Sequence, residues 1–414
     1  MSESNDCDDQ LEKYNTKKKI VVVGSGWASA SFIKNINTTI YDIEVIAPNV
    51  SFIYTPLLSY SAISGFDVKE KITDLNSIQY IKNNVVDVDF NNNYVVVENK
   101  SGDDEREKIS YDYLVLAHGA QVNTFNIQGV DKFCYYLKND NDAWCICDRL
   151  SLESKKRLDL RDKLKLDDHT IENIPKKNIA VIGCGLAGAE LVGNLIDLDK
   201  FNIMAIDGLP NPLANFKNEN LSNWVKDLWE FNNVQCYFGN FVKKIDDKNI
   251  YFAHTDKTLS NDTSRDLKSD INISIPYDIA IWCGGIKISP LSLTVNKFLG
   301  VQNRFGIPVG ENFNVTGYDN VFAIGDCAYS GLMPSAQVAF QQGKFLANHF
   351  NSGFWNNHSF KFRNLGQICY VGKGNSVYKL NDMVFKGKFT GYFNSVIHAY
   401  NAINFKQSWN NLWK

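Results

Sequence analysis

Hydrophobic and polar positions along the chain form two similar units, each made of an apolar run, a glycine-rich turn and an amphipathic stretch. The first unit has its apolar run at Ile20–Val23, glycines at Gly24 and Gly26, and a further apolar run at Ile43–Pro48. The second unit repeats this order with "IAVIG", then "LAGAELVGNLIDL", then Phe201–Asp207. An apolar run that ends at glycine and continues with helical spacing is typical of a strand, a tight turn and a helix. The chain therefore predicts two βαβ units in an α/β protein.

The segments around these units predict how they are grouped. Residues 139–173 are charged with helical spacing and end at the break "NIPKKN", and "IPYDIAIWCGG" is typical of a buried strand before a glycine turn. Asn320–Ala328 is an apolar strand that leads to an acid, and Ser335–Phe350 is an amphipathic helix. We predict an acidic N-terminal tail at 1–17, a first domain formed by 18–175 and 286–350, a second domain at 176–285, and a separate C-terminal region at 351–414.

The composition is that of a folded protein in a reducing compartment. Of 414 residues, 44% are hydrophobic and 21% charged, and no apolar run approaches the ~18 residues of a transmembrane helix. The first 16 residues are polar and acidic, unlike a secretory signal or an Arg-rich transit peptide. We expect all nine cysteines to be reduced and mostly buried, because the one close pair, Cys145 and Cys147, matches neither a redox motif nor a zinc motif.

Charge is unevenly distributed along the chain. The net charge is −3, but the stretch from Lys361 to Lys414 holds eight Lys or Arg against one acid, so it carries +7 and the preceding residues carry −10. The same stretch is rich in aromatic residues, including Trp409 and Trp413. A basic, aromatic-rich terminus on an acidic body is typical of contact with an anionic membrane surface or nucleic acid. A small terminal domain that happens to be basic would show the same composition.

Both glycine motifs have the chemistry of a dinucleotide site. Glycine lets the backbone turn tightly and approach a pyrophosphate, and the N-terminus of the following helix supplies free N–H groups. The second motif is complete, with Gly183, Gly185 and Gly188, whereas the first has Ser29 in the third position. The third residue serves helix–strand packing, so we expect Ser29 to affect packing and to leave the phosphate site intact. The alternative for the first motif is a relic that binds nothing.

Acidic residues distinguish the expected ligands of the two motifs. Asp207 lies 22 residues after Gly185 with no arginine beside it, which favours the ribose of NADH over the phosphorylated ribose of NADPH. The corresponding strand of the first unit ends at Ala47–Asn49 without an acid. Asp326 follows a returning strand, where it could bind a polyol chain such as the ribityl of FAD. An aspartate that caps the next helix would occupy the same position.

These motifs, together with "YTPLL", "LVLAHGAQVNTF", "SAQVAFQQG" and "LGQICYVG", resemble the two-dinucleotide flavoproteins, and specifically the type II (alternative) NADH:quinone oxidoreductases. The resemblance runs nearly from end to end, and "TPLL" and "AQVAFQQG" are its most specific parts. It implies two Rossmann-like domains, one for FAD and one for NADH. It also implies that hydride passes from NADH to FAD and that two electrons then pass to a ubiquinone-type quinone, without proton pumping.

The resemblance further implies partners and a location. The C-terminal region would be amphipathic helices that dock on a membrane, and the protein would be a homodimer with neither nucleic acid nor metal as a ligand. It would be a peripheral protein of the mitochondrial inner membrane or, since no presequence is visible, of the cytoplasmic face of another membrane.

Roles for individual residues follow from the same resemblance. Residues implied in FAD binding are Gly24, Gly26, Trp27, Ala28, Thr55, Pro56, Leu57, Gly119, Asp326, Ala336 and Gln337. Residues implied in NADH binding are Gly183, Gly185, Gly188, Glu190, Asp207 and Gly285. Glu190 would lie near the nicotinamide, and Gln337 and Gln341 would border the flavin ring and the quinone. These last three are the implied catalytic residues.

The chain departs from the family pattern at a few positions. Ser29 replaces a glycine, Ser59 stands where a proline usually follows "TPLL", and His118 replaces a small or aliphatic residue. "GCGLAGAE" also lacks the Pro-Thr often found within it. None of these changes removes a group that performs chemistry, but Ser59 and His118 are expected near the flavin. His118 and Glu190 are the candidates for a proton path to quinone.

Apolar residues of the tail fall at helical spacing in two stripes. The first stripe contains Phe393, Val396, Ile397, Tyr400 and Ile403, and the second contains Phe405, Trp409, Leu412 and Trp413, with Lys406 and Lys414 beside it. Trp and Lys at an apolar edge suit the headgroup region of a membrane. A helix that packs on the core or on a second copy of the chain would have the same pattern.

Two other functions fit the same framework. A sulfide:quinone oxidoreductase would need cysteines at the flavin, where Cys327 is the candidate, and a flavoprotein similar to apoptosis-inducing factor would use NADH to switch binding partners. A disulfide reductase would need a Cys-x₄-Cys pair, which the sequence does not contain.

Overall fold

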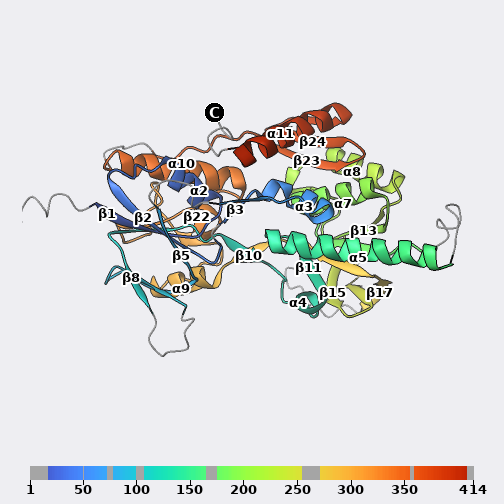
Figure 1. Cartoon of the computed structure of the whole chain (residues 1–414), viewed down its shortest axis with the longest axis horizontal. Helices are drawn as coiled ribbons and strands as arrows, with labels where there is room; N and C mark the ends of the chain where they lie inside the picture. The colour runs from blue at the N-terminus through green and yellow to red at the C-terminus, as the bar shows by residue number, and fades with distance from the viewer. Residues whose placement is uncertain are drawn as a thin grey trace, which may run out of the picture. The chain divides into compact units, whose positions relative to one another are not determined.

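The computed structural model describes residues 17–49, 51–71, 78–98, 107–164, 175–253, 271–354 and 359–407. Contacts divide the chain into two compact units. Figure 1 shows the whole chain coloured by residue number. The first unit comprises Met1–Phe52, Glu70–Gln121 and Lys287–Arg363, and the second comprises Ile53–Lys69, Val122–Ile286 and Asn364–Lys414. The domain limits predicted from the sequence differ from this division in three places. The segments 53–69 and 122–175 belong to the second unit, and 351–414, predicted as a separate region, is divided between the two units.

The first unit is built on a five-stranded parallel sheet, and three of its strands contain apolar runs that helices can cover on both faces: Ile20–Val23, Tyr113–Leu116 and Val321–Ala323. In spatial order the sheet is β21 (Val321–Ala323), β9 (Tyr113–Leu116), β1 (Lys18–Val23), β2 (Tyr41–Ala47) and β5 (Ile78–Lys82). The order reverses between β1 and β9, and in open parallel sheets ligands bind at the carboxyl ends of strands at such a reversal. The predicted α/β class is confirmed.

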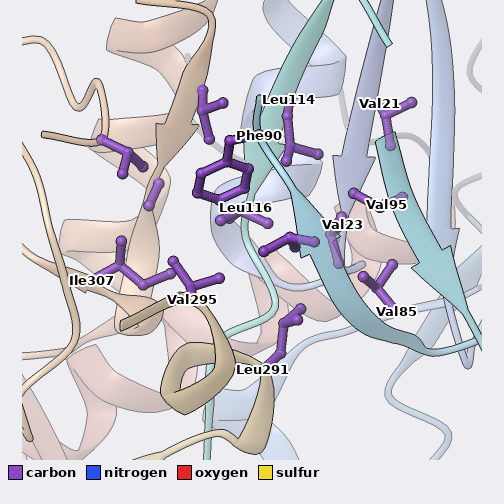
Figure 2. Packing of buried hydrophobic residues seen from close by; sticks show 14 of the residues in the cluster. Val21, Val23, Val85, Phe90, Val95, Leu114, Leu116, Leu291, Val295 and Ile307 are labelled. Carbon is purple, nitrogen blue, oxygen red and sulfur yellow. The ribbon is translucent and has the colours of Figure 1, made fainter. Parts of the chain in front are cut away.

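Short elements surround this sheet. They are α2 (Trp27–Asn35), α9 (Pro290–Phe298), α10 (Ala336–Asn351), the turn η4 (Gly325–Cys327), the antiparallel strands β6 (Val85–Asp89), β7 (Tyr94–Val97) and β8 (Lys108–Ser110), and the pair β20 (Ile307–Pro308) and β22 (Ala328–Tyr329). Side chains from the sheet, from β6 and β7, and from α9 form one buried cluster, in which Val23, Val95 and Leu291 are labelled in Figure 2. This core fixes the strands whose carboxyl ends carry the first glycine motif.

Helices α10 and α2 lie side by side (Figure 1) and touch at a glycine. A Cβ placed on Gly343 of α10 would lie 2.2 Å from the carbonyl oxygen of Ala28 and 2.9 Å from the backbone nitrogen of Phe32. The ring of Phe32 meets that of Phe350 edge-on, with centroids 5.6 Å apart. The absence of a side chain at 343 therefore sets the spacing between the helix of the first glycine motif and α10.

The serine of the first motif is buried inside α2. Ser29 is fully buried, and its hydroxyl has no hydrogen-bond partner among the described residues. A buried hydroxyl without a partner loses its hydration and gains nothing in return. Ser29 is thus a cost to stability within α2.

Replacing Ser29 with alanine is expected to raise the free energy of unfolding by about 1 kcal/mol, because it removes the unpaired hydroxyl and improves helix propensity. Urea unfolding followed by circular dichroism measures this. The matched control is Ser61→Ala, since the equally buried Ser61 hydroxyl donates to the carbonyl of Phe66 at 2.7 Å and its loss should destabilise. A destabilised Ser29→Ala variant would contradict the interpretation.

The second unit repeats the parallel architecture. In spatial order its main sheet is β11 (Cys134–Tyr136), β18 (Ile279–Trp282), β12 (Asn178–Ile182), β13 (Asn202–Asp207) and β14 (Gln235–Phe238). The order reverses between β12 and β18, so this unit too has a switch point beside its glycine motif. Other elements are α3 (Leu58–Ser64), α4 (Val130–Phe133), α5 (Asp140–Leu164), α7 (Leu186–Leu198), α8 (Glu219–Phe231), and the antiparallel strands β15 (Phe241–Ile245), β16 (Asn249–Ala253) and β17 (Ile271–Pro276).

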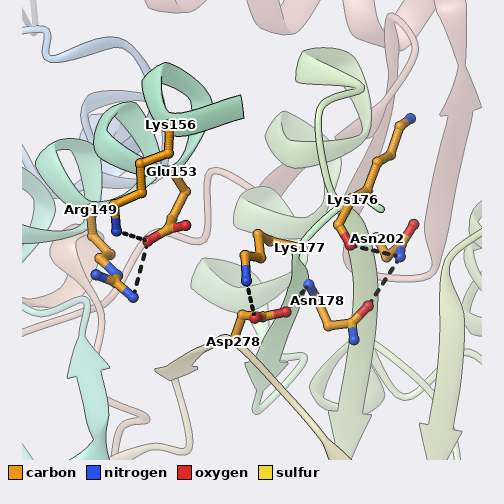
Figure 3. Close-up of polar contacts among 8 residues, drawn as sticks. All are labelled: Arg149, Glu153, Lys156, Lys176, Lys177, Asn178, Asn202 and Asp278. Atoms are coloured by element: carbon orange, nitrogen blue, oxygen red, sulfur yellow. Dashed lines mark hydrogen bonds and ion pairs between the residues drawn. The ribbon is translucent and has the colours of Figure 1, made fainter. Parts of the chain in front are cut away.

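Polar contacts hold the starting end of β12 in place (Figure 3). Asp278 accepts a hydrogen bond from the backbone of Asn178 and forms an ion pair with Lys177, both at 2.8 Å. Asn202 donates across the strands to the side chain of Asn178 at 3.0 Å. These contacts leave the carboxyl end of β12 to the glycine loop.

The C-terminal region contains a sheet that the sequence analysis did not predict. Strands β23 (Gln367–Gly372), β24 (Asn375–Leu380) and β25 (Met383–Gly387) are antiparallel, and α11 (Lys388–Gln407) follows them. Helix α11 packs on β24, where a Cβ on Gly391 would lie 1.9 Å from the carbonyl oxygen of Gly374. Within the described residues, no helix combines the length and apolarity that crossing a membrane requires.

The eight described cysteines are free thiols, as predicted. The expectation that most are buried is wrong, because only Cys184, Cys327 and Cys369 are fully buried and Cys145 is exposed. The remaining four are partly accessible: Cys134 and Cys236 lie on edge strands, Cys147 lies in α5, and Cys283 directly follows β18.

Candidate functional site

The first glycine of each motif is required by the backbone itself. Gly24 and Gly183 have φ of +115° and +95°, values that favour glycine. Each donates its N–H to the end of the next strand, to Ile46 at 2.9 Å and to Ile206 at 2.8 Å. A Cβ on Gly24 would lie 2.4 Å, and one on Gly183 2.6 Å, from backbone atoms at the end of the adjacent strand of the sheet. In both motifs, therefore, the loop backbone passes in direct contact with the backbone at the carboxyl end of the neighbouring strand.

At the second position of each motif, neither the backbone conformation nor a close neighbour within the protein requires glycine. Gly26 and Gly185 have φ of −82° and −70°, which any residue can adopt, and a Cβ on either would meet no described atom within 4 Å. Each precedes a helix whose first turn lacks a side-chain cap. Free N–H groups beside an open space match the size and charge of a pyrophosphate. Both loops thus fit a dinucleotide.

The third position differs between the motifs. A Cβ on Gly188 would lie 1.8 Å from the carbonyl oxygen of Gly183, so α7 tolerates only glycine there. Helix α2 accommodates the whole side chain of Ser29 at the equivalent position. The distance between the helix and its glycine loop is therefore larger in the first motif than in the second.

Asp207, at the end of β13, is hydrogen-bonded to the backbone of the second loop. Its carboxylate accepts hydrogen bonds from the backbone of Cys184 at 2.6 Å and of Leu209 at 2.8 Å. Burial raises the pKa of Asp207, and these two hydrogen bonds oppose that rise. Asp207 is thus placed beside the loop, and its predicted contact with a ribose stays a prediction.

The structure brings Asp326 next to the first loop, although the two are 300 residues apart in sequence. The preceding residue, Gly325, has φ of +74°, and a Cβ on it would lie 3.0 Å from the Cβ of Ala28. Gln342, which is fully buried, accepts from the N–H of Gly325 at 2.7 Å and donates to Ser330 at 3.0 Å. We did not single out Gln342 from the sequence, though its place on the buried face of an amphipathic helix was a signal for it.

The side-chain amide of Gln341 is hydrogen-bonded to the backbone. Its amide donates to the carbonyl of Arg363 and accepts from the N–H of the same residue, both at 2.9 Å. Gln337 and Ala336 lie in the first turn of α10, whose N-cap Ser335 accepts from Val338 at 3.2 Å. The catalytic roles of Gln337 and Gln341 stay predictions, and Gln341 has a clear structural one.

Other predicted residues of the FAD site occupy varied positions. Trp27 is buried and packs edge-on against Phe52, with ring centroids 4.8 Å apart. Gly119 has φ of +69° and resembles Gly26 in that a Cβ would meet no described atom within 4 Å. Thr55–Leu57 form a short turn, η1, that leads into α3 of the second unit. Gly285, which was predicted to bind NADH, has φ of +123° in the turn between β18 and the next strand, which begins at Ile286.

His118 lies at the carboxyl end of β9 as a neutral imidazole. Its Nε2 is 2.9 Å from the Ser292 hydroxyl, and its buried Nδ1 has no partner among the described residues. Burial lowers the pKa of His118 to about 4, so the ring is uncharged at neutral pH. An unpaired buried nitrogen at a switch point is a further observation that fits a bound dinucleotide in the first unit.

Glu190 on α7 forms the only described carboxyl–hydroxyl contact beside the second loop. Its Oε2 lies 3.4 Å from the hydroxyl of Ser59 on α3. Burial raises the pKa of Glu190 to about 8, and the Ser59 hydrogen bond acts in the opposite direction. Among the described residues, no cluster of His, Cys, Asp and Glu could hold a metal ion.

A sequence model of one protein family matches residues 18–343, which include both glycine loops and Asp326. The chain belongs to this family, the pyridine nucleotide-disulphide oxidoreductases. Its relatives include a probable mitochondrial NADH-ubiquinone oxidoreductase of Schizosaccharomyces pombe, 28% identical over 81% of this chain and 62% of the relative, and an external mitochondrial NADH-ubiquinone oxidoreductase of Saccharomyces cerevisiae, 28% identical over 80% and 62%. A probable NADH dehydrogenase of Dictyostelium discoideum is 28% identical over 87% of this chain and 80% of its own length.

The chain therefore spans about three fifths of the length of the first curated relatives it matches. Among solved structures, NDH2 from Plasmodium falciparum in complex with NADH has a TM-score of 0.78 at 24% identity and covers 92% of this chain and 94% of its own. A sulfide:quinone oxidoreductase of Aquifex aeolicus has a TM-score of 0.71 at 16% identity and covers 94% and 92%. These structures share the fold, and the resemblance to alternative NADH:quinone oxidoreductases is confirmed by the relatives.

Proposed function

We propose that this protein is a type II NADH:quinone oxidoreductase that does not pump protons, with FAD in the first unit and NADH in the second. The observation that carries the proposal is the pair of open spaces at Gly26 and Gly185, each at a helix N-terminus and at a switch point. Relatives named NADH-ubiquinone oxidoreductases support the choice of substrates.

The two sites differ in the acidic residue at the end of the second strand, and this difference supports FAD as the bound cofactor of the first unit and NADH as the substrate of the second. Asp207 lies at the second loop, where an acid favours the free ribose of NADH, and β2 of the first unit has no acid at its end. In the first unit Gly24 and Gly26 would hold the pyrophosphate of FAD, and Asp326 its ribityl chain. FAD, once bound, supplies the capacity to accept hydride and to pass on electrons.

The chain's own residues would position the two nucleotides and move a proton. Gln342 holds Gly325 so that Asp326 stays at the first loop, and neutral His118 offers its unpaired Nδ1 without adding charge. In the second unit Asp207 stiffens the loop that takes the pyrophosphate of NADH. Glu190, with its pKa of about 8, can exist in both protonation states near neutral pH and is the group we assign to proton movement at the nicotinamide end.

A direct assay tests this function. The purified protein should carry a yellow flavin, turn over rapidly with NADH and a short-chain quinone, and turn over little with NADPH. Reduction of the flavin by NADH without quinone turnover would favour a switching role similar to that of apoptosis-inducing factor. Absence of bound flavin would refute the proposal.

Sulfide oxidation is disfavoured by the thiol that would have to perform it. Cys327 is fully buried, and its Sγ donates to the carbonyls of Leu116 at 3.3 Å and Ile324 at 3.2 Å. Burial raises the pKa of Cys327 to about 12, so the reactive thiolate is scarce at neutral pH.

We also propose that α11 docks on a membrane, as a peripheral attachment to the mitochondrial inner membrane. The helix buries its small and polar residues Thr390, Gly391 and Asn394, and it exposes an apolar face. That exposed face consists of Phe389, Tyr392, Phe393 and Val396, with Met383 and Phe385 of β25 also exposed. An exposed apolar face beside Lys386 and Lys388 suits an anionic lipid surface. The predicted stripe residues Tyr400, Ile403 and Phe405 have undescribed side chains, and Trp409, Leu412 and Trp413 lie outside the described residues.

Replacing Phe389 and Phe393 together with serine is expected to weaken binding to anionic vesicles at least about tenfold, because each phenylalanine would bury its ring at the lipid surface. Co-sedimentation with phosphatidylcholine–cardiolipin vesicles measures this. Phe231→Ser is the matched control, since this residue of α8 is 87% exposed but lies on another element. Unchanged vesicle binding with loss of a dimer in sedimentation velocity would instead assign the face to a second copy of the chain.

A further inference from the structure

The buried hydroxyl group of Ser59 on α3 lies close to the carboxyl group of Glu190 on α7. Ser59 is 5% exposed and lies in the first turn of α3, which packs against α7. Its Oγ is 3.4 Å from Oε2 of Glu190, and these two residues are 131 positions apart in sequence. The contact is made within the second unit, so it is part of a single packed body.

Glu190 meets few other polar groups in its surroundings. Strand β23 also packs on α7 and presents Cys369, which is fully buried and donates weakly to the carbonyl of Leu186 at 3.7 Å. Burial and the charge of Glu190 raise the pKa of Cys369 well above its usual value, so the thiol stays neutral while Glu190 titrates. The neighbouring Tyr370 donates its hydroxyl to Asp197, further along α7.

Asp207 at the end of β13, also next to α7, is engaged with the backbone of Cys184 and Leu209. In the described part of the chain, therefore, Ser59 is the one hydrogen-bond donor assigned to the Glu190 carboxyl. A lone donor in a desolvated setting has a large effect on the balance between the charged and neutral forms.

We propose that Ser59 is a positioning residue for Glu190, holding its carboxyl against α3 and favouring its charged form through the hydrogen bond to Oε2. This inference deepens the proposed function, on which it rests for the presence of a nicotinamide near Glu190. Without the hydroxyl, the carboxyl would keep its proton to higher pH and would lose a fixed orientation.

The titration of Glu190 in the flavin-loaded protein tests the inference without measuring turnover. Difference infrared spectroscopy follows the protonated carboxyl band between pH 5 and 10, and Glu190→Gln identifies the band by removing it. We expect a midpoint of about 8 in the unaltered protein. In Ser59→Ala the midpoint should rise by about one pH unit, the effect of one hydrogen bond to a charged group. At the original midpoint the charged fraction would then fall about fivefold.

Ser61→Ala is the matched control on the same helix. Its hydroxyl is as buried as that of Ser59 but donates to the carbonyl of Phe66 and not to Glu190. It should lower stability and leave the midpoint unchanged. Ser59→Thr keeps a hydroxyl and should restore the midpoint at least in part. An unchanged or lowered midpoint in Ser59→Ala overturns the inference.

Protein stability offers a second readout with a defined sign. The pKa of Glu190 is raised in the folded chain from 4.5 to about 8, so the folded state binds the proton more tightly than the unfolded state. The stabilising contribution is complete below pH 4.5 and is lost as the pH rises to about 8. The loss should extend to higher pH in Ser59→Ala and vanish in Glu190→Gln. If NADH fails to reduce the flavin, the proposed function fails while both readouts still decide the role of Ser59.

Discussion

The Gly185→Val variant is expected to fold, to keep its FAD and to lose affinity for NADH by at least about 100-fold. A Cβ on Gly185 would meet no described atom within 4 Å, and valine can adopt its φ of −70°. The substitution therefore causes no steric clash within the protein. The side chain would instead fill the space in front of the helix N-terminus. Several charge-assisted hydrogen bonds to the pyrophosphate would then be lost, each worth about 1.5–3 kcal/mol.

Gly26→Val is the matched variant in the other unit, because Gly26 has a similar φ of −82° and a Cβ on it would likewise meet no described atom within 4 Å. It should fold, lose FAD and keep NADH binding. Calorimetric titration with NADH and the flavin absorbance of the purified proteins separate the two effects. If Gly185→Val released FAD and Gly26→Val released NADH, the assignment of the nucleotides would be reversed.

The free energy of unfolding of the Gly343→Ala variant is expected to be lower by about 3 kcal/mol, a large effect for one added methyl group. In an exposed helix the same change stabilises by about 1 kcal/mol, because alanine has the higher helix propensity. Here a Cβ would lie 2.2 Å from the carbonyl oxygen of Ala28, and a backbone atom in the helix of the first loop cannot move aside cheaply. The sign of the effect is therefore diagnostic.

Chemical denaturation of the flavin-free and flavin-loaded proteins measures this change, and Lys344→Ala on the exposed side of α10 is the control. The control should be neutral or slightly stabilising. The flavin-loaded Gly343→Ala protein should also release FAD faster, because α2 carries the first loop at its N-terminus. A stabilised Gly343→Ala variant would show that α2 and α10 are more loosely packed than their contact indicates.

Much of the parallel architecture could be predicted from local patterns. Continuous apolar runs such as Val21–Val23 and Ile179–Ile182 are buried strands, and each ends in a glycine with positive φ. These features follow from neighbouring residues, because a buried parallel strand and a tight turn each need particular residue types in immediate succession. The three strands of 367–387 escaped prediction because short, part-exposed strands with polar residues lack a strong periodicity.

Residue type and spacing are enough to predict the two dinucleotide motifs, the acid Asp207 after the second motif, and a basic, aromatic C-terminal region. Contacts between residues far apart in the sequence are visible only in the folded chain: Gly325 against Ala28, Gln341 with Arg363, and Ser59 with Glu190. The same contacts show that the apolar residues Phe389, Tyr392, Phe393 and Val396 of α11 are exposed, and that Gly343 sets the distance between α10 and α2. The physical reason is that helical and strand periods define faces, whereas the partner of each face is chosen by packing across long stretches of chain.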